Sequence, residues 1–226
     1  MSAFRPALHT PSKWGNLWTN RAPLEVLNVE LADYRVQELD GVQGFLVQGD
    51  VETLFRMALE LPRGGRYLEI GTWEGLSALI VAHGLLASLN LRAEITCIDI
   101  WEGNEGQHRR FEKFKEHIDR LGLADYFTYL RMTSDEAFDV LHDQRYDMIF
   151  NDSVTTLDGR YHDVMTWRQR LTPNGRMFGH DCLPGSPALA GLEKAAAELG
   201  AEVLIHPGTH GLWELRPRNG WDGSRS

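Results

Sequence analysis

Cysteine is scarce in this sequence, with only Cys97 and Cys182 among 226 residues. A disulfide framework needs more cysteines than this, which favours a reducing compartment. Long apolar runs are also missing: no stretch approaches the roughly 18 residues of a membrane-spanning helix, and residues 1–20 lack the apolar core of an export signal. We therefore expect a cytoplasmic protein with no membrane partner.

Basic residues are outnumbered by acidic ones. The 23 lysines and arginines face 32 aspartates and glutamates, which gives a formal net charge of −9. Such a surface repels phosphate backbones, so the sequence predicts no nucleic-acid partner. With 42% hydrophobic residues, the chain can bury the core of one large α/β domain.

The first 41 residues have an irregular pattern that prolines interrupt, and they carry Trp14 and Trp18 at helical spacing. We interpret residues 1–41 as an N-terminal arm that packs on the main domain or on a second subunit, or as a lid over a substrate pocket. Such an arm is compatible with a homodimer. Residues 42–218 are expected to form the main domain, and residues 219–226 a flexible tail.

Strand and helix patterns alternate through the main domain. A helical apolar stripe begins near Asp50, a candidate N-cap, and stops before Pro62. Further helices are expected at 76–89, 107–121, 134–141, 160–170 and 189–199, and strands at 66–70, 95–100, 127–132, 146–150, 176–179, 203–205 and 212–215. The alternation predicts an α/β fold with a doubly wound, mostly parallel sheet. Only a short turn separates the last two strands, so this pair should be antiparallel.

The first predicted strand leads into the loop Glu69-x-Gly71-x-x-x-Gly75. Ligands of doubly wound sheets bind at the carboxyl ends of the strands. Gly71 permits a tight turn and Gly75 a close approach to a ligand, while Ser77 lies near a helix N-terminus that attracts carboxylates. Glu69 can pair with an ammonium group. The loop therefore suits an amino-acid moiety such as the methionine part of S-adenosylmethionine.

Two other interpretations of this loop are open. A dinucleotide site uses Gly-x-Gly-x-x-Gly to approach a pyrophosphate, whereas here three residues separate the glycines and Glu69 faces that position. The spacing disfavours NAD and an NAD-linked oxidoreductase. A tight turn without a ligand is the other alternative, although it leaves the acidic side chain without a packing reason. We expect Thr72 and Trp73, inside the loop, to contact the cofactor as well.

The ends of the next two strands carry further candidates for cofactor binding. Asp99 can accept hydrogen bonds from both ribose hydroxyls, with Ile100 beside it, and Trp101 can stack on an adenine ring. Alternatively, Asp99 is a cap or turn residue and Trp101 a core aromatic. The third strand runs into Thr133 and Ser134. The Ser134 hydroxyl either hydrogen-bonds adenine or caps the following helix.

Together these residues resemble the class I S-adenosylmethionine-dependent methyltransferases. The stretch Glu69-x-Gly71-x-x-x-Gly75-x-Ser77 is similar to the first motif of that family, and Asp99 to its ribose-binding acid. The resemblance covers residues from about 42 to 216. It implies S-adenosylmethionine as the cofactor and a Rossmann-like, seven-stranded sheet whose last strand is antiparallel.

Within this superfamily, the second half of the chain is similar to a group of sugar and antibiotic O-methyltransferases. The register runs without a gap from Asp152 to Gly175 and continues through Gly179-His180-Asp181. The second acid and the histidine of the group's motif Ile-Asp-Gly-Asp-His-Ser-Tyr fall on Val154 and Thr155. Threonine cannot deprotonate a hydroxyl at neutral pH, so the usual base is missing.

Three other residues are candidates for catalysis. Asp152 follows the fourth strand and can also contact the cofactor, His180 follows the fifth strand, and His108 lies in a glycine-rich loop that can act as a flap. Either histidine can instead be a surface or turn residue.

A divalent metal ion offers another way to make the acceptor hydroxyl more acidic. The resemblance places metal ligands at Asp152 and Asp181, and Mg²⁺ prefers such oxygen ligands. We therefore expect a methyltransferase acting on a hydroxyl of a small molecule, with Mg²⁺ as a candidate second cofactor. The departures at Val154 and Thr155 motivate an alternative, a protein that binds S-adenosylmethionine without methyl transfer or with repurposed chemistry.

Overall fold

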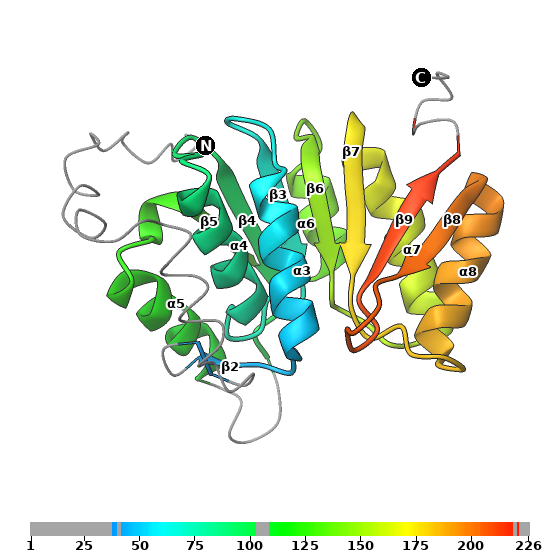
Figure 1. Ribbon diagram of the computed structural model, residues 1–226, viewed down its shortest axis with the longest axis horizontal. Helices are drawn as coiled ribbons and strands as arrows, with labels where there is room; N and C mark the ends of the chain where they lie inside the picture. Colours follow the sequence, from blue (N-terminus) through cyan, green and yellow to red (C-terminus); the bar gives the residue numbers. More distant parts are fainter. Residues whose placement is uncertain (1–37, 40–41, 103–108, 219–220, 222–226) are drawn as a thin grey trace.

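A seven-stranded sheet forms the centre of the structure, a computed structural model that describes residues 38–39, 42–102, 109–218 and 221. The strands lie in the order β5-β4-β3-β6-β7-β9-β8 (Figure 1). Their bounds are β3 Arg66–Ile70, β4 Glu94–Asp99, β5 Phe127–Arg131, β6 Tyr146–Asn151, β7 Leu171–Gly179, β8 Ala201–Ile205 and β9 Trp213–Pro217.

Strand direction agrees with the sequence prediction. The strands from β5 to β7 in this order run parallel, and β9 is antiparallel to both β7 and β8. The doubly wound, mostly parallel sheet and its antiparallel last strand are therefore confirmed. The chain adds β4 and β5 on one side of β3 and then returns to add β6 on the other side. The carboxyl ends of β3 and β6 thus flank the switch point where such sheets bind ligands.

Helices cover both faces of the sheet (Figure 1). One face carries α3 (Gln48–Leu59), α4 (Leu76–Ala87) and α5 (Arg110–Arg120), and the other carries α6 (Ser134–Val140), α7 (Leu157–Trp167) and α8 (Pro187–Leu199). Short 3₁₀ turns, η2 (Ala124–Tyr126) and η3 (Arg168–Arg170), precede β5 and β7.

Each face of the sheet has its own apolar core. Helix α4 is apolar on all sides. This composition fits its position, because α3 packs over it and almost none of its surface meets water. Helix α5 instead buries one face, through Phe114 and Ile118. Within the described ranges, no helix is long and apolar enough to cross a membrane.

Some helix starts differ from the sequence expectation. Helix α3 begins at Gln48, and Asp50 is not its N-cap but a residue of its first turn, whose carboxylate accepts a hydrogen bond from Val47 N at 2.8 Å. Helix α7 begins at Leu157 rather than at residue 160, because the hydroxyl of Thr156 caps it. These boundaries depend on caps that apolar spacing does not indicate.

The predicted arm lies almost entirely outside the described residues, as does most of the predicted tail. The described residues of the predicted arm form β1 (Glu38–Leu39). This strand pairs antiparallel with β2 (Val42–Gln43), at the start of the predicted main domain. The division into arm, domain and tail stays a prediction.

Candidate functional site

A hollow of about 320 Å³ lies at the carboxyl ends of the central strands. Residues from the predicted site that line it are Gly71, Thr72, Trp73, Ser77, Asp99, Asp152, His180 and Asp181. The rest of the lining consists of Ser153, which flanks Asp152, and of five residues that the sequence did not indicate, which are Gly44, Phe45, Leu46, Leu76 and Arg110. The hollow therefore joins the glycine loop after β3 to the polar residues after β6 and β7.

A second hollow of similar volume, about 310 Å³, lies at the opposite ends of the strands. Its carboxylate, Asp147, already accepts hydrogen bonds from Arg66 N at 2.9 Å and Thr172 Oγ1 at 3.0 Å. We assign the site to the first hollow because it lies at the carboxyl ends of the strands, where doubly wound sheets bind ligands, and because the glycine loop lines it.

Both loop glycines occupy positions where a side chain would collide. Gly71 has a φ of 88°, and a Cβ there would lie 2.4 Å from the carbonyl oxygen of Asp152. Gly75 has a φ of 92° and caps α4, and its Cβ would lie 2.7 Å from the ring of Phe114. The glycines therefore let the loop pass close to β6 and α5, while Trp73 between them also has a positive φ of 52°.

Glu69 is fully buried beneath this loop. Its Oε2 accepts a hydrogen bond from the Tyr67 hydroxyl at 2.7 Å. Among the described residues Oε1 and Thr72 Oγ1 make no well-aligned hydrogen bond, although the hydroxyls of Thr72 and Ser77 lie near the carboxyl group. Burial raises the pKa of Glu69 to about 8, against hydrogen bonds that lower it. A buried carboxylate with such an oxygen is an acceptor that a ligand's ammonium group would satisfy.

Asp99 ends β4 and holds the loops around the hollow. Its Oδ2 accepts a hydrogen bond from Trp73 N at 2.8 Å, and its Oδ1 accepts one from Trp101 N at 2.6 Å. The two backbone contacts support the turn interpretation of Asp99. Because each carboxylate oxygen has a second lone pair, and because the side chain lines the hollow, ribose binding is still compatible with this geometry.

Trp101 is a core residue and not an adenine platform. Its side chain is only 1% exposed, its ring stacks on Phe114 at 5.2 Å, and its Nε1 donates to Trp73 O at 2.6 Å. The expectation that it covers adenine is therefore wrong, because alternation within this segment turns Trp101 inward and leaves Ile100 45% exposed.

An aromatic pair of one exposed and one half-buried ring lines the hollow instead. The ring of Phe45 stacks on Trp73 at 5.1 Å, and the Arg110 guanidinium lies 4.7 Å from the Trp73 ring. Phe45 is 76% exposed, which leaves most of its ring available to a ligand.

The hydroxyls after β5 are engaged in the protein. Thr133, not Ser134, caps α6 by accepting a hydrogen bond from Glu136 N. Ser134 Oγ donates to Asp163 at 2.9 Å and accepts from Trp167 Nε1 at 2.7 Å. Neither residue lines the hollow, so the structure lends no support to adenine recognition by these two hydroxyls.

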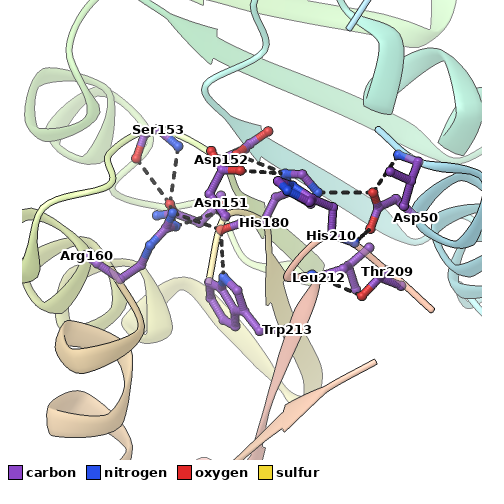
Figure 2. Close-up of polar contacts among 12 residues, drawn as sticks. Asp50, Asn151, Asp152, Ser153, Arg160, His180, Thr209, His210, Leu212 and Trp213 are labelled. Atoms are coloured by element: carbon purple, nitrogen blue, oxygen red, sulfur yellow. Dashed lines mark hydrogen bonds and ion pairs between the residues drawn. The ribbon is translucent and has the colours of Figure 1, made fainter. Parts of the chain in front are cut away.

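His180 lies among carboxylates at the end of β7 (Figure 2). It is 1% exposed, with Nδ1 at 3.2 Å from Asp181 Oδ1 and Nε2 at 3.2 Å from Asp50 Oδ2. The contact with Asp50 is a close ion pair, and Nε2 makes no well-aligned hydrogen bond to a described residue. These carboxylates, with Asp152, overcome the opposing effect of burial and raise the pKa of His180 to about 10.

Asp152 and Asp181, the two acids predicted at this edge of the sheet, differ in their contacts. Desolvation raises the pKa of Asp152 to about 7 even though a quarter of its side chain stays exposed, and its Oδ1 lies 4.0 Å from His180 Nδ1, beyond hydrogen-bond distance. The contact with His180 lowers the pKa of Asp181, which has a positive φ of 64°. Asp152 is therefore the carboxylate of this pair that is free to meet a ligand.

Arg160 fixes the backbone behind this group (Figure 2). It is fully buried and donates to Asn151 O at 2.8 Å, to Asn151 Oδ1, and to His180 O at 3.1 Å. Because these are the residues immediately before Asp152 and Asp181, Arg160 sets the spacing of the two acids. The sequence indicated Arg160 only as the start of a helix.

Two positions singled out by the resemblance lie away from the hollow. Val154 and Thr155, where the resemblance expects an acid and a histidine, do not line it, and Thr155 is exposed. His108 lies outside the described residues, so its role as a flap histidine stays a prediction.

A family model described as a methyltransferase domain matches residues 68–182, about half of the chain and the segment from β3 to the end of β7. No curated protein matches the sequence. Several solved structures share the fold. An O-methyltransferase from Bacillus cereus, in complex with SAH, is 14% identical with a TM-score of 0.56, covering 90% of this chain and 94% of its own.

Two further structures extend the range of chemistry. The TDP-rhamnose 3'-O-methyltransferase of calicheamicin biosynthesis is 16% identical with a TM-score of 0.59, over 93% of this chain and 96% of its own. A precorrin-6y C5,15-methyltransferase from Geobacter metallireducens is 13% identical with a TM-score of 0.54, over 73% and 84%. The family match and the shared fold confirm the resemblance: the chain belongs to the methyltransferase domain family and has the fold of class I S-adenosylmethionine-dependent methyltransferases.

Proposed function

We propose that this methyltransferase moves the methyl group of S-adenosylmethionine to a hydroxyl oxygen of a small molecule, such as a sugar or another natural product. One observation carries the proposal: a single hollow is lined both by the glycine loop with Asp99 and by the polar group of Asp152, His180 and Asp181. Cofactor and acceptor can therefore meet in one place, as an in-line methyl transfer requires.

The residues around the glycine loop fit the cofactor. Oε1 of Glu69 and the hydroxyl of Thr72 are buried polar atoms that make no well-aligned hydrogen bond among the described residues. The ammonium group of the methionine moiety would satisfy the first, and its carboxylate would lie near Ser77 at the start of α4. Asp99 would accept the ribose hydroxyls. The bound cofactor supplies an electrophilic methyl group on a sulfonium.

Asp152 is the residue that we assign as the base. Asp99 is held by two backbone N–H groups and Asp181 by His180, whereas Asp152 lines the hollow without a hydrogen bond to His180. His180 itself is a poor base, because carboxylates face both of its ring nitrogens and favour the protonated form. Asp152 therefore takes the place left open by Val154 and Thr155.

The acceptor class rests on two supports. The structure that shares this fold and acts on TDP-rhamnose uses a sugar hydroxyl by its name, and the exposed ring of Phe45 offers a stacking surface for a planar or sugar ring. The precorrin enzyme shows that the fold does not determine the acceptor atom. The acidic composition disfavours nucleic acid as the acceptor. The same proposal places the enzyme in the cytoplasm as a homodimer.

The alternative is a protein that binds the cofactor without transferring methyl. It is favoured by the positions of Val154 and Thr155, which provide no base. Mg²⁺ held by Asp152 and Asp181 would make an acceptor hydroxyl more acidic in either case. The donors around Asp181 include two histidines, however, and this set is less suited to Mg²⁺ than to softer ions.

Two measurements test the proposal. Calorimetry should detect binding of S-adenosylmethionine and S-adenosylhomocysteine, and single-turnover assays should show transfer of labelled methyl to a member of a panel of hydroxylated metabolites. Asp152→Asn should lower the transfer rate by about 10²–10⁴-fold, the usual effect of losing a general base, with little change in cofactor affinity. Asp143→Asn is the control, because its side chain is 84% exposed.

The outcomes separate the hypotheses. A protein that binds neither sulfur ligand is not an S-adenosylmethionine enzyme. Cofactor binding without transfer to any panel member favours the non-catalytic alternative. Full activity of Asp152→Asn would show that the proton leaves by another route.

A further inference from the structure

Three donor residues converge at the hollow, two of which, His180 and Asp181, line it. One ligand atom each from His180, Asp181 and His210 lie within 4.8 Å of one another. His180 and Asp181 follow β7, whereas His210 lies in the connection between β8 and β9. Two imidazoles and a carboxylate thus come together from two segments of the chain, and Figure 2 shows His180 and His210 side by side.

A single buried acid positions both histidines. Asp50 is fully buried in α3, where its Oδ1 accepts a hydrogen bond from His210 N at 3.0 Å and its Oδ2 lies 3.2 Å from His180 Nε2. A histidine that binds a metal ion usually directs its second ring nitrogen at such a carboxylate. With Nε2 facing Asp50, the Nδ1 atom of His180 is directed at Asp181.

The spacing of these atoms suits a small cation. His180 Nδ1 and Asp181 Oδ1 are 3.2 Å apart. Two donors that each bind one ion at about 2.1 Å, with tetrahedral angles, stand roughly 3.4 Å from each other. Asp181 has a positive φ of 64°, a left-handed conformation that aspartate adopts more readily than most residues.

We propose that His180, Asp181 and His210 bind a divalent transition-metal ion of the Zn²⁺ or Co²⁺ type. Imidazole nitrogens favour these ions, whereas Mg²⁺ favours oxygen ligands in an octahedron. Three protein ligands leave a coordination position open, as in catalytic sites. Asp152, 4.0 Å from His180 Nδ1, lies at the edge of the group and adds negative charge that favours a cation.

The proposal deepens the proposed function, because an ion here would lie at the hollow and make an acceptor hydroxyl more acidic. It assigns new roles to two residues. His210 becomes a metal ligand, whereas the hypothesis of Mg²⁺ bound by Asp152 and Asp181 gives it no role. Asp50 becomes a positioning residue, which acts on the ion through the two histidines. Binding of the ion itself does not depend on the identity of the acceptor.

The test measures metal binding to the full chain after treatment with EDTA. Titration with Co²⁺, followed by its visible absorption, and with Zn²⁺ against a chromogenic chelator, should show one ion per chain. Zn²⁺ should bind at least about 100-fold more tightly than Mg²⁺. His210→Asn should lower the Zn²⁺ affinity at least tenfold, and Asp50→Asn about 10–100-fold, as expected for an orienting partner. His206→Asn, in the same connection but facing Glu214, should leave it unchanged.

Several results would overturn the proposal: absence of Co²⁺ and Zn²⁺ binding, Mg²⁺ binding as tight as that of Zn²⁺, or an unchanged affinity in His210→Asn. Thermal unfolding of each variant verifies that a loss of binding is not a loss of fold. Parallel calorimetry with S-adenosylmethionine separates failure of the metal site from failure of the proposed function. Cofactor binding without Zn²⁺ binding removes only the metal site, whereas Zn²⁺ binding without cofactor binding removes the proposed function.

Discussion

Replacing Glu69 with glutamine should stabilise the cofactor-free protein at alkaline pH and, at the same time, weaken its binding of S-adenosylmethionine. Both effects have one cause, the complete burial of this carboxyl beneath the glycine loop. The folded protein holds Glu69 neutral up to a pKa of about 8, whereas the ordinary value is 4.5. Ionising it in the folded state therefore costs free energy that the unfolded chain does not spend.

The sign and size of the stability effect follow from linkage. Between pH 4.5 and about 8 the folded state holds a proton at Glu69 that the unfolded state has lost, so stability falls as pH rises through this window. Each pH unit is worth about 1.4 kcal/mol, so the full loss is on the order of 5 kcal/mol above pH 8. Glutamine does not titrate and can still accept the hydrogen bond from Tyr67.

The effect on the cofactor has the opposite sign. An ammonium group near Oε1 favours the ionised carboxylate, so glutamine would lose a charge-assisted hydrogen bond of about 1.5–3 kcal/mol, or roughly 10–100-fold in Kd. The wild-type protein should also release up to one proton on binding at pH 7. Calorimetry in two buffers of different ionisation enthalpy measures this release, and the Glu69→Gln variant should lack it.

Urea denaturation at pH 6 and pH 9 provides the decisive comparison. Relative to the wild type, Glu69→Gln should gain about 5 kcal/mol at pH 9 but only about 2 kcal/mol at pH 6, because part of the loss in the wild type has already occurred there. Glu116→Gln, an exposed substitution on α5, should change little at either pH. An equal difference between Glu69→Gln and the wild type at both values would refute the reasoning, since it would mean that Glu69 does not change its charge across this range.

Three further substitutions test other parts of the site. Asp99→Ala should weaken cofactor binding by about 1.5–3 kcal/mol in calorimetry, through loss of a charged acceptor; unchanged affinity would leave it only the turn role that its contacts with Trp73 and Trp101 show. Gly71→Ala should lower the free energy of unfolding by at least about 1–3 kcal/mol, because of its positive φ and its approach to β6, and a neutral effect in urea denaturation would contradict the close contact. Arg160→Met should cost about 1–3 kcal/mol by leaving buried carbonyls unpaired, and a fully stable variant would show that β6 and β7 are held together by other contacts.

The sheet and the cofactor loop could be predicted from the sequence because their signals are local. Each buried strand is a short apolar run, and the spacing from Glu69 to Gly75 describes a turn within one strand–helix unit. The mostly parallel direction of the strands followed from the alternation of elements, since parallel neighbours need helical crossovers. Local signals failed where a single residue decides a helix cap, as at Asp50, or the direction of a side chain, as at Trp101, which the backbone turns into the core.

The other half of the site could not be predicted in the same way, because distant segments build it. Asp50 and His210 are joined by a hydrogen bond across 160 positions, and Arg160 reaches His180 from another helix. Asp50 had a local explanation, a helix cap, which concealed its contact with β7 and the β8–β9 connection. No spacing rule indicates that a residue of α3 places a histidine 160 positions away.

This difference between the two halves has a chemical consequence. The cofactor half is compact in sequence, so its residues can be compared directly with a family motif, and they identify the methyl donor. The acceptor half has lost the local acid and histidine of the resembling group at Val154 and Thr155. It gains a buried acid, Asp50, and a histidine, His210, which converge on the same strand end. If an ion held by this assembled group assists proton removal by Asp152, the activity should depend on Asp50, a residue that does not line the hollow.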